Sequence, residues 1–235
     1  MQFFVGTSGY SYKEWKGNFY PEKMPAKEML GYYAQKFSTV EINNSFYKMP
    51  TSDVVESWVK QTPASFRFVL KAPNKITHRK RLKEADEPFE ELLSAVAVLK
   101  KRQGPILVQL PPNMKKNLER LETFLTMVAG RASIAFEFRH ESWFDDEVFD
   151  CLGNYSCALC VADAEELPAV DLVSTTDWGY IRLRREKYTD RALRVWIKRI
   201  ESQPWKSAYV FFKHEDTGTG PKLAARFLEL AAAES

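Results

Sequence analysis

Short apolar segments alternate with amphipathic ones along most of the chain. Gln2–Gly6 has the length and composition of a buried strand, and Ala26–Phe37 carries apolar residues at helical spacing. The same alternation predicts strands at Gln2–Gly6, Thr39–Asn43, Phe66–Lys71, Pro105–Leu110, Ser133–Arg139, Cys157–Asp163, Trp178–Arg184 and Ser207–Lys213. It predicts helices at Ala26–Phe37, Ser52–Gln61, Asp86–Arg102, Asn117–Ala129, Asp145–Leu152, Thr189–Ser202 and Pro221–Ala232.

A helix is predicted between successive strands everywhere except in Ala164–Asp177, which has no clear period. Strands that alternate with helices indicate a parallel sheet covered by helices. A doubly wound open sheet is the alternative, but no G-x-G-x-x-G motif follows the first strand. The 235 residues come close to the about 250 of a typical eight-stranded barrel. We therefore predict one α/β domain over residues 1–235, a (β/α)8 TIM-type barrel.

Charged residues occur in strands that should be apolar on both faces. Glu41 lies between Val40 and Ile42, and Arg182 lies between two apolar neighbours in the same way. Because side chains change face at every residue of a strand, the polar set should face the barrel interior. Most of it lies at the carboxyl ends of the strands, where barrels of this kind carry their active sites. The expected interior set at this end is Glu41, Asn43, Lys71, Gln109, Glu137, Arg139, Asp163, Arg182 and Lys213.

Three carboxylates against four cations in this set suit an anionic ligand. The leading prediction is an enzyme, a hydrolase or an isomerase, that acts on a phosphorylated or other anionic substrate. Glu41 and Glu137 are the candidate bases, and His78 is the candidate acid or phosphate donor. A structural network of ion pairs is the alternative explanation of the same residues. The candidate substrate-binding residues are Tyr10, Trp15, Asn43, Lys71, Gln109, Arg139, Asp163, Arg182 and Lys213.

Two loops add features that suit nucleic acid. The segment 71–83 holds six Lys or Arg residues and no acid, and Thr7–Pro21 contains five aromatic residues. A basic rim binds phosphates, and aromatic rings stack on bases. A non-catalytic nucleic-acid-binding protein is therefore the second hypothesis, and a small-molecule sensor without chemistry is the third.

The cysteines and histidines bear on the cellular compartment of the protein and on metal binding. Three cysteines cannot form a disulfide framework, and no signal peptide precedes the first strand, which indicates a cytoplasmic protein. No apolar run approaches the about 20 residues that span a bilayer, so we expect no membrane partner. His78, His140 and His214 follow predicted strand ends, but no metal-binding signature contains them. A divalent metal is an alternative that the sequence does not favour, and no cofactor or oligomeric state is identified.

Several distinctive motifs follow one another along the first three fifths of the chain. They are Gly6–Tyr12, Thr39–Tyr47, Phe66–Phe68 with Lys71–Pro73, Gln109–Pro112 and Phe136–Trp143. Together these motifs resemble the YecE-like family, also called domain of unknown function 72. The resemblance implies a TIM-type barrel and supplies no reaction. Arg182–Arg185 and Phe212–Asp216 depart from the commoner family pattern and add charge, which indicates a subgroup with a different ligand.

Overall fold

The computed structural model of the chain describes residues 1–167, 170–213 and 218–234. In these residues, eight parallel strands follow one another around a barrel in the order β1-β8-β7-β6-β5-β4-β3-β2. The predicted TIM-type barrel is confirmed. The strands are β1 (Gln2–Thr7), β2 (Thr39–Ile42), β3 (Arg67–Lys71), β4 (Gln103–Gln109), β5 (Ile134–Glu137), β6 (Ala158–Asp163), β7 (Trp178–Leu183) and β8 (Ser207–Phe212).

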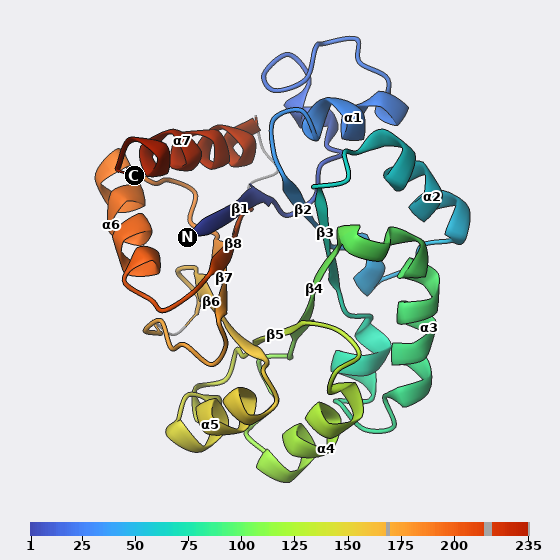
Figure 1. The fold of residues 1–235 in the computed structure, drawn as a ribbon, viewed down its shortest axis with the longest axis vertical. Coiled ribbons are helices and arrows are strands. Elements are labelled where there is room, and N and C mark those ends of the chain that lie inside the picture. Colours follow the sequence, from blue (N-terminus) through green and yellow to red (C-terminus); the bar gives the residue numbers. More distant parts are fainter. Residues whose placement is uncertain (168–169, 214–217, 235) are drawn as a thin grey trace.

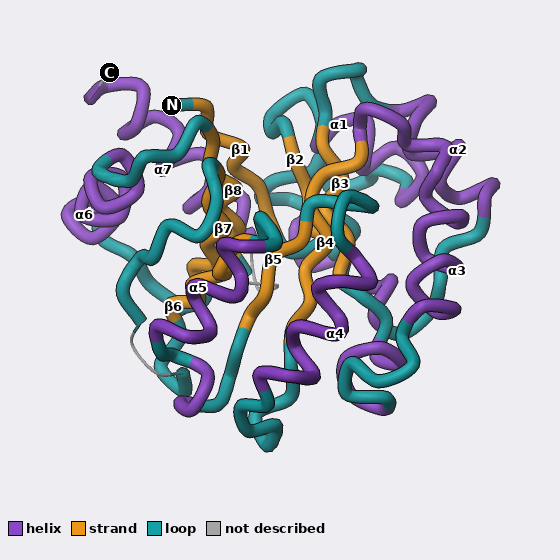
Figure 2. The backbone as a smooth tube through the Cα atoms, turned by 60° about the horizontal axis from the view of Figure 1, so that its bottom comes forward, coloured by secondary structure: helices purple, strands orange, loops and turns teal. Residues whose placement is uncertain are grey.

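Helices surround the strands as an outer ring in chain order (Figure 1). Figure 2 shows the strands running through the centre, with α2 and α3 on one side and α6 and α7 on the other. The described part of 164–177, between β6 and β7, is a loop without a helix. None of the described helices has both the length and the apolar composition that a membrane crossing requires. The helices are α1 (Met29–Tyr33), α2 (Ser52–Gln61), α3 (Asp86–Val96), α4 (Leu118–Val128), α5 (Asp146–Asn154), α6 (Asp190–Glu201) and α7 (Thr219–Glu234).

Two predicted helices are shorter than the sequence pattern indicates. The first begins as a 3₁₀ turn over Ala26–Glu28 before α1. The helix predicted over Asp86–Arg102 ends at Val96 and continues as 3₁₀ turns over Ala97–Arg102. Lys100 has a φ of 50°, outside the helical region, so the α-helix cannot continue to β4.

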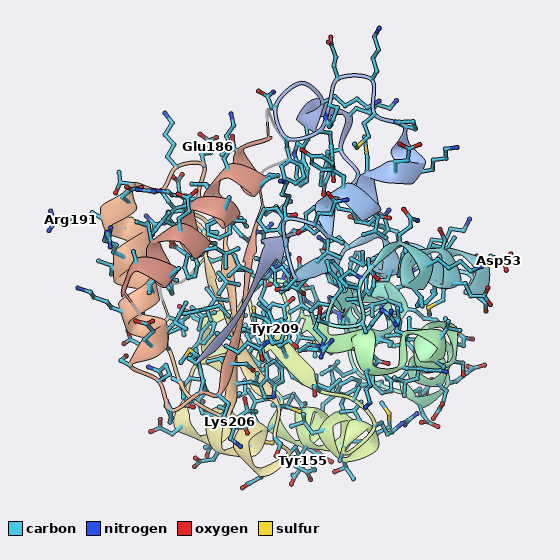
Figure 3. The ribbon with its side chains drawn as sticks, turned by 45° about the horizontal axis from the view of Figure 1, so that its top comes forward. Asp53, Tyr155, Glu186, Arg191, Lys206 and Tyr209 are labelled. Atoms are coloured by element: carbon cyan, nitrogen blue, oxygen red, sulfur yellow. The ribbon has the colours of Figure 1, made fainter. Side chains whose placement is uncertain are left out.

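Large apolar side chains fill the part of the barrel interior that lies away from the carboxyl ends of the strands. Tyr180 and Phe211 are completely buried there and pack against Tyr209, which lies near the centre of the barrel in Figure 3. The strands contribute these side chains from every second residue, as the alternation rule requires. A packed floor therefore closes the interior below its polar end.

The last seam of the barrel, between β1 and β2, is closed by a tyrosine of α1. The Tyr33 hydroxyl accepts from the Thr7 amide at 2.8 Å and donates to the Thr39 carbonyl at 3.0 Å. A Cβ at Gly6 would lie 2.1 Å from the Thr39 carbonyl oxygen, so only glycine permits this approach of the strands. One buried hydroxyl thus takes the place of part of the backbone ladder.

We expect Tyr33→Phe to lower the free energy of unfolding by about 1–3 kcal/mol, because it leaves a buried amide and a buried carbonyl without partners. Urea denaturation measures this loss. Tyr32→Phe is the matched control, since the Tyr32 hydroxyl has no hydrogen bond within the described residues. Equal stability of the two variants would show that the hydroxyl does not close the seam.

Candidate functional site

An arginine held between two carboxylates lies at the centre of the barrel mouth, the carboxyl end of the strands. Arg182 of β7 donates from Nη2 to Oε1 of Glu41 at 2.7 Å and from Nη1 to Oε2 of Glu137 at 2.6 Å. All three side chains are buried. They come from β7, β2 and β5 and face the interior, where the strand alternation predicts them. We call these residues the ion triad.

Neighbouring polar groups complete the hydrogen bonding of Glu41. Its Oε1 accepts from the Ser8 hydroxyl at 2.7 Å and from Nδ2 of Asn43 at 3.2 Å, while its Oε2 accepts from the Tyr180 hydroxyl at 2.6 Å. Burial alone would raise the pKa of this carboxyl, but the charge of Arg182 and these hydrogen bonds outweigh burial and lower the pKa. Glu41 is therefore ionised at neutral pH.

Glu137 is held in the same way on the other side of Arg182. Its Oε1 accepts from Nε2 of Gln109 at 2.8 Å and from Nε of Arg139 at 3.1 Å. Burial opposes ionisation, but the charges of Arg182 and Arg139 prevail and lower the pKa of Glu137 to about 2. A carboxylate of such low pKa is a weak base at neutral pH, and its strongest contacts are to the two arginines.

Lys71 stands at the end of β3 and shares the mouth with the ion triad. Its Nζ lies 4.0 Å from the centre of the Phe46 ring, and within the described residues no carboxylate forms a salt bridge with it. Burial and the charge of Arg182 outweigh the attraction of Glu41 and Glu137 and lower the pKa of Lys71 to about 8. The lysine is therefore still mainly protonated at neutral pH and loses its proton just above it.

Two buried guanidinium nitrogens at the mouth have no hydrogen-bond partner in the part of the chain that the structure describes. They are Nε of Arg182 and Nη1 of Arg184. Burial and the nearby charge of Arg182 lower the pKa of Arg184. Buried donors of this kind usually have an acceptor, so these two nitrogens can donate to a molecule bound at the mouth. Arg184 was not among the predicted site residues, although its position continues the alternation of Tyr180 and Arg182.

His78 reaches the mouth from a π-helical turn, Lys75–Arg79. Its ring centre lies 4.9 Å from that of Phe46, edge to face, and Nδ1 lies 2.9 Å from the Thr77 hydroxyl oxygen. Burial and the charges of Lys71 and Arg139 lower the pKa of His78. The imidazole is therefore neutral at neutral pH, and Phe46 contacts both it and Lys71.

Asp163 does not belong to the interior set, and the prediction that it does is wrong. It accepts from Nε of Arg185 at 2.7 Å and from the Tyr188 hydroxyl at 2.8 Å, beside α6. Cys160 of the same strand packs in the barrel interior. Residues three apart on a strand face opposite sides, so Asp163 points outwards.

The aromatic residues of the first loop separate into two groups. Trp15 is 1% exposed and packs between Tyr12 and Tyr20, so it belongs to the core and is not available for stacking on a ligand. Tyr10 is half-buried and lines a cavity beside the mouth together with Tyr12.

The remaining predicted residues have different positions. Lys213 follows β8 with the same parity as Phe211, which faces the interior. Nδ1 of His140 accepts from the Ser142 amide and caps a 3₁₀ turn, so this nitrogen is engaged locally. His214 lies outside the described residues. Within residues 1–167, 170–213 and 218–234, no three His, Cys, Asp or Glu side chains converge in a way that could hold a metal ion.

Comparison with known proteins agrees with the motifs. Residues 4–235 match the family described as "Protein of unknown function DUF72". The UPF0759 protein YecE of Escherichia coli is 34% identical over 113 residues, which are 48% of this chain and 42% of YecE. The UPF0759 protein YunF of Bacillus subtilis is 28% identical over 155 residues, which are 63% of this chain and 54% of YunF. The match thus spans about half the length of these curated relatives.

Solved structures share the whole barrel. A DUF72 family protein from Thermotoga maritima superposes with a TM-score of 0.86 at 28% identity and covers 100% of both chains. Another, from Enterococcus faecalis, has a TM-score of 0.81 at 18% identity and covers 98% of this chain and 96% of its own. At that identity the second likeness concerns the fold alone.

Replacing Arg182 by Met would leave two buried carboxylates without their shared counter-ion. We expect the free energy of unfolding at neutral pH to fall by about 3–5 kcal/mol, as measured by urea denaturation. Lys206→Met is the control, because it removes only an exposed pair with Asp177 and should leave stability nearly unchanged.

The loss should shrink as the pH falls. In the wild type, the stabilisation from Glu137 is present above the ordinary pKa of a glutamate and disappears as the pH falls towards about 2. In Arg182→Met the pKa values of both carboxyls should rise, so mild acid neutralises them and relieves the penalty. An Arg182→Met protein as stable as the wild type at neutral pH would contradict this account of the ion triad.

Proposed function

The chain belongs to the DUF72 family, whose description supplies no reaction. From the side chains at its barrel mouth, we propose that it is an enzyme acting on a phosphorylated substrate. The observation that carries the proposal is an excess of positive charge in a half-buried place. The carboxylates Glu41 and Glu137 face Arg182, Arg139, Arg184 and Lys71. An anion at the mouth would balance this excess.

A phosphate group suits the unused donors in particular. Nη1 of Arg184 is buried without an acceptor in the described residues, and a phosphate oxygen is a strong acceptor for a guanidinium. The Lys71 ammonium packs over the Phe46 ring and forms no salt bridge with a carboxylate of the described residues, so it can also bind an anion. Arg139, whose Nε donates to Glu137, is the third cation; Lys71 ends β3, and Arg139 and Arg184 follow the ends of β5 and β7.

The ion triad supports the site, and Lys71 transfers the proton. Glu41 and Glu137 are held ionised by Arg182, which makes them weak bases, so in this proposal they position Arg182 and balance its charge. The pKa of Lys71, about 8, lies near the pH at which a general acid or base works best. Neutral His78, whose ring packs edge to face with Phe46, is the second proton carrier. Hydrolases and isomerases of phosphate compounds both need such a pair.

The basic residues around the mouth, in segment 71–83 and at Lys116 and Arg185, support the nucleic-acid-binding hypothesis less well than the sequence indicates. Many of these cations already have acidic partners within the chain, which reduces the charge available to a phosphate backbone. Arg81 also donates to Asn113. The pairs are Lys75 with Glu91, Lys80 with Glu84, Lys116 with Asp145 and Glu147, and Arg185 with Asp163.

Anion binding should weaken as the pH rises through about 8, because Lys71 then loses its proton and its charge. Sulfate is the probe, since its own charge does not change in this range, and calorimetric titration at a series of pH values measures its affinity. Lys71→Arg keeps the positive charge and should remove the weakening. An affinity independent of pH around this value in the wild type would contradict the assignment of Lys71.

Arg184→Met should lower the affinity for ribose 5-phosphate by about 10- to 100-fold, the effect of losing one charged hydrogen bond. Arg185→Met is the matched control, because the neighbouring residue points outwards to Asp163. Equilibrium titration of both variants gives the comparison. Equal affinities would place the phosphate elsewhere.

A further inference from the structure

A cavity whose lining includes four aromatic and two amide side chains opens beside the barrel mouth. It has a volume of about 470 Å³, within the about 300–1,000 Å³ of small-molecule sites, and its walls include Tyr12, Asn43, Asn44, Tyr47 and Trp58. Tyr47 is 78% exposed, so most of its ring is accessible to a ligand.

The cavity is connected to the anion site through shared residues. Asn43 lines the cavity and donates to Glu41 of the ion triad. The 3₁₀ turn Asn44–Phe46 separates the two places. Phe46 contacts Tyr47 on the cavity side, with ring centres 4.9 Å apart, and Lys71 on the mouth side, with Nζ 4.0 Å from the ring centre. Phe46 therefore contacts both Lys71 at the mouth and Tyr47, a residue of the cavity wall.

One aromatic ring of the cavity wall, that of Tyr12, is held in a fixed orientation. The Tyr12 hydroxyl donates to the Ser8 carbonyl at 2.7 Å, and its ring lies over Gly9, where a Cβ would meet the ring at 2.8 Å. Ser8 also donates to Glu41, so the ring and the ion triad are joined through one residue. A prearranged aromatic face lowers the cost of binding a flat ring.

Side-chain amides at the edge of the cavity favour a nucleobase as this ring. Asn43 and the exposed Asn44 each carry one donor group and one acceptor, which is the combination that the edge of a base presents. Bases stack on tyrosine faces through their π-systems. A plain sugar phosphate would leave the exposed face of Tyr47 unused.

We infer that this cavity is a base-binding subsite and that the substrate is a nucleotide, with its phosphate on Lys71, Arg139 and Arg184 and its base stacked on Tyr47. The inference rests on the proposed function, because it takes the phosphate position from it. It adds the substrate class and assigns Tyr47 and Tyr12 to specificity.

Titration of the full chain with adenosine 5′-monophosphate and with ribose 5-phosphate tests the inference. The wild type should bind the nucleotide about 10-fold more tightly or better, the contribution of one stacked base. Tyr47→Ala should remove this advantage and leave the affinity for ribose 5-phosphate unchanged. Tyr47→Phe, which keeps the ring, should retain the advantage.

The outcomes separate this inference from the proposed function. Equal affinities for the two compounds in the wild type, or a Tyr47→Ala variant that keeps the preference for the nucleotide, would overturn the base-binding subsite and leave the phosphate site intact. Failure of both compounds to bind would overturn the proposed function and the inference with it. Because Tyr47 is largely exposed, its substitution should leave folding intact, and circular dichroism checks this.

Discussion

The bridge that Arg182 makes between Glu41 and Glu137 is the interaction on which the mouth of the barrel depends. Burying three charged side chains costs free energy unless each has a partner of opposite charge. Here the partners lie on three strands, β2, β5 and β7, so all three strands must be in place before both carboxylates are paired. Ser8, Asn43, Tyr180 and Gln109 supply the remaining hydrogen bonds from further strands and loops. The contact therefore ties most of the barrel circumference to one point.

This arrangement also determines the chemistry of the mouth. With the carboxylates committed to Arg182, the charges of Lys71, Arg139 and Arg184 are only partly balanced, and the positive field of Arg182 helps to lower the pKa of Lys71 to about 8. In the proposed function, the same buried network stabilises the barrel and supports anion binding at its opening. The structural and functional explanations of these residues, which the sequence leaves as alternatives, are compatible in this proposal.

The sequence predicted the barrel and most of the mouth because strand alternation is a strong signal. Glu41, Glu137 and Arg182 stand among apolar neighbours, so their inward direction followed directly. The direction of Asp163 was predicted wrongly because its strand carries no other charged residue that would show which positions face the interior. Trp15 could belong equally to the core or to the rim of the mouth, because its sequence position suits both. The seam at Tyr33 and the contacts of Phe46 with Lys71 and His78 join elements that are distant in the sequence, and spacing along the chain does not determine such contacts.

A crystal structure of the protein with bound tungstate would test the central claim most directly. Tungstate has the shape and charge of phosphate, and its anomalous scattering locates it independently of the protein atoms. We expect one strong site in contact with Lys71, Arg139 and Arg184, above an unchanged contact of Arg182 with its two carboxylates. A tungstate ion bound only elsewhere, for example at the outward-facing Arg185 and Arg191, with the mouth occupied by water, would contradict the account.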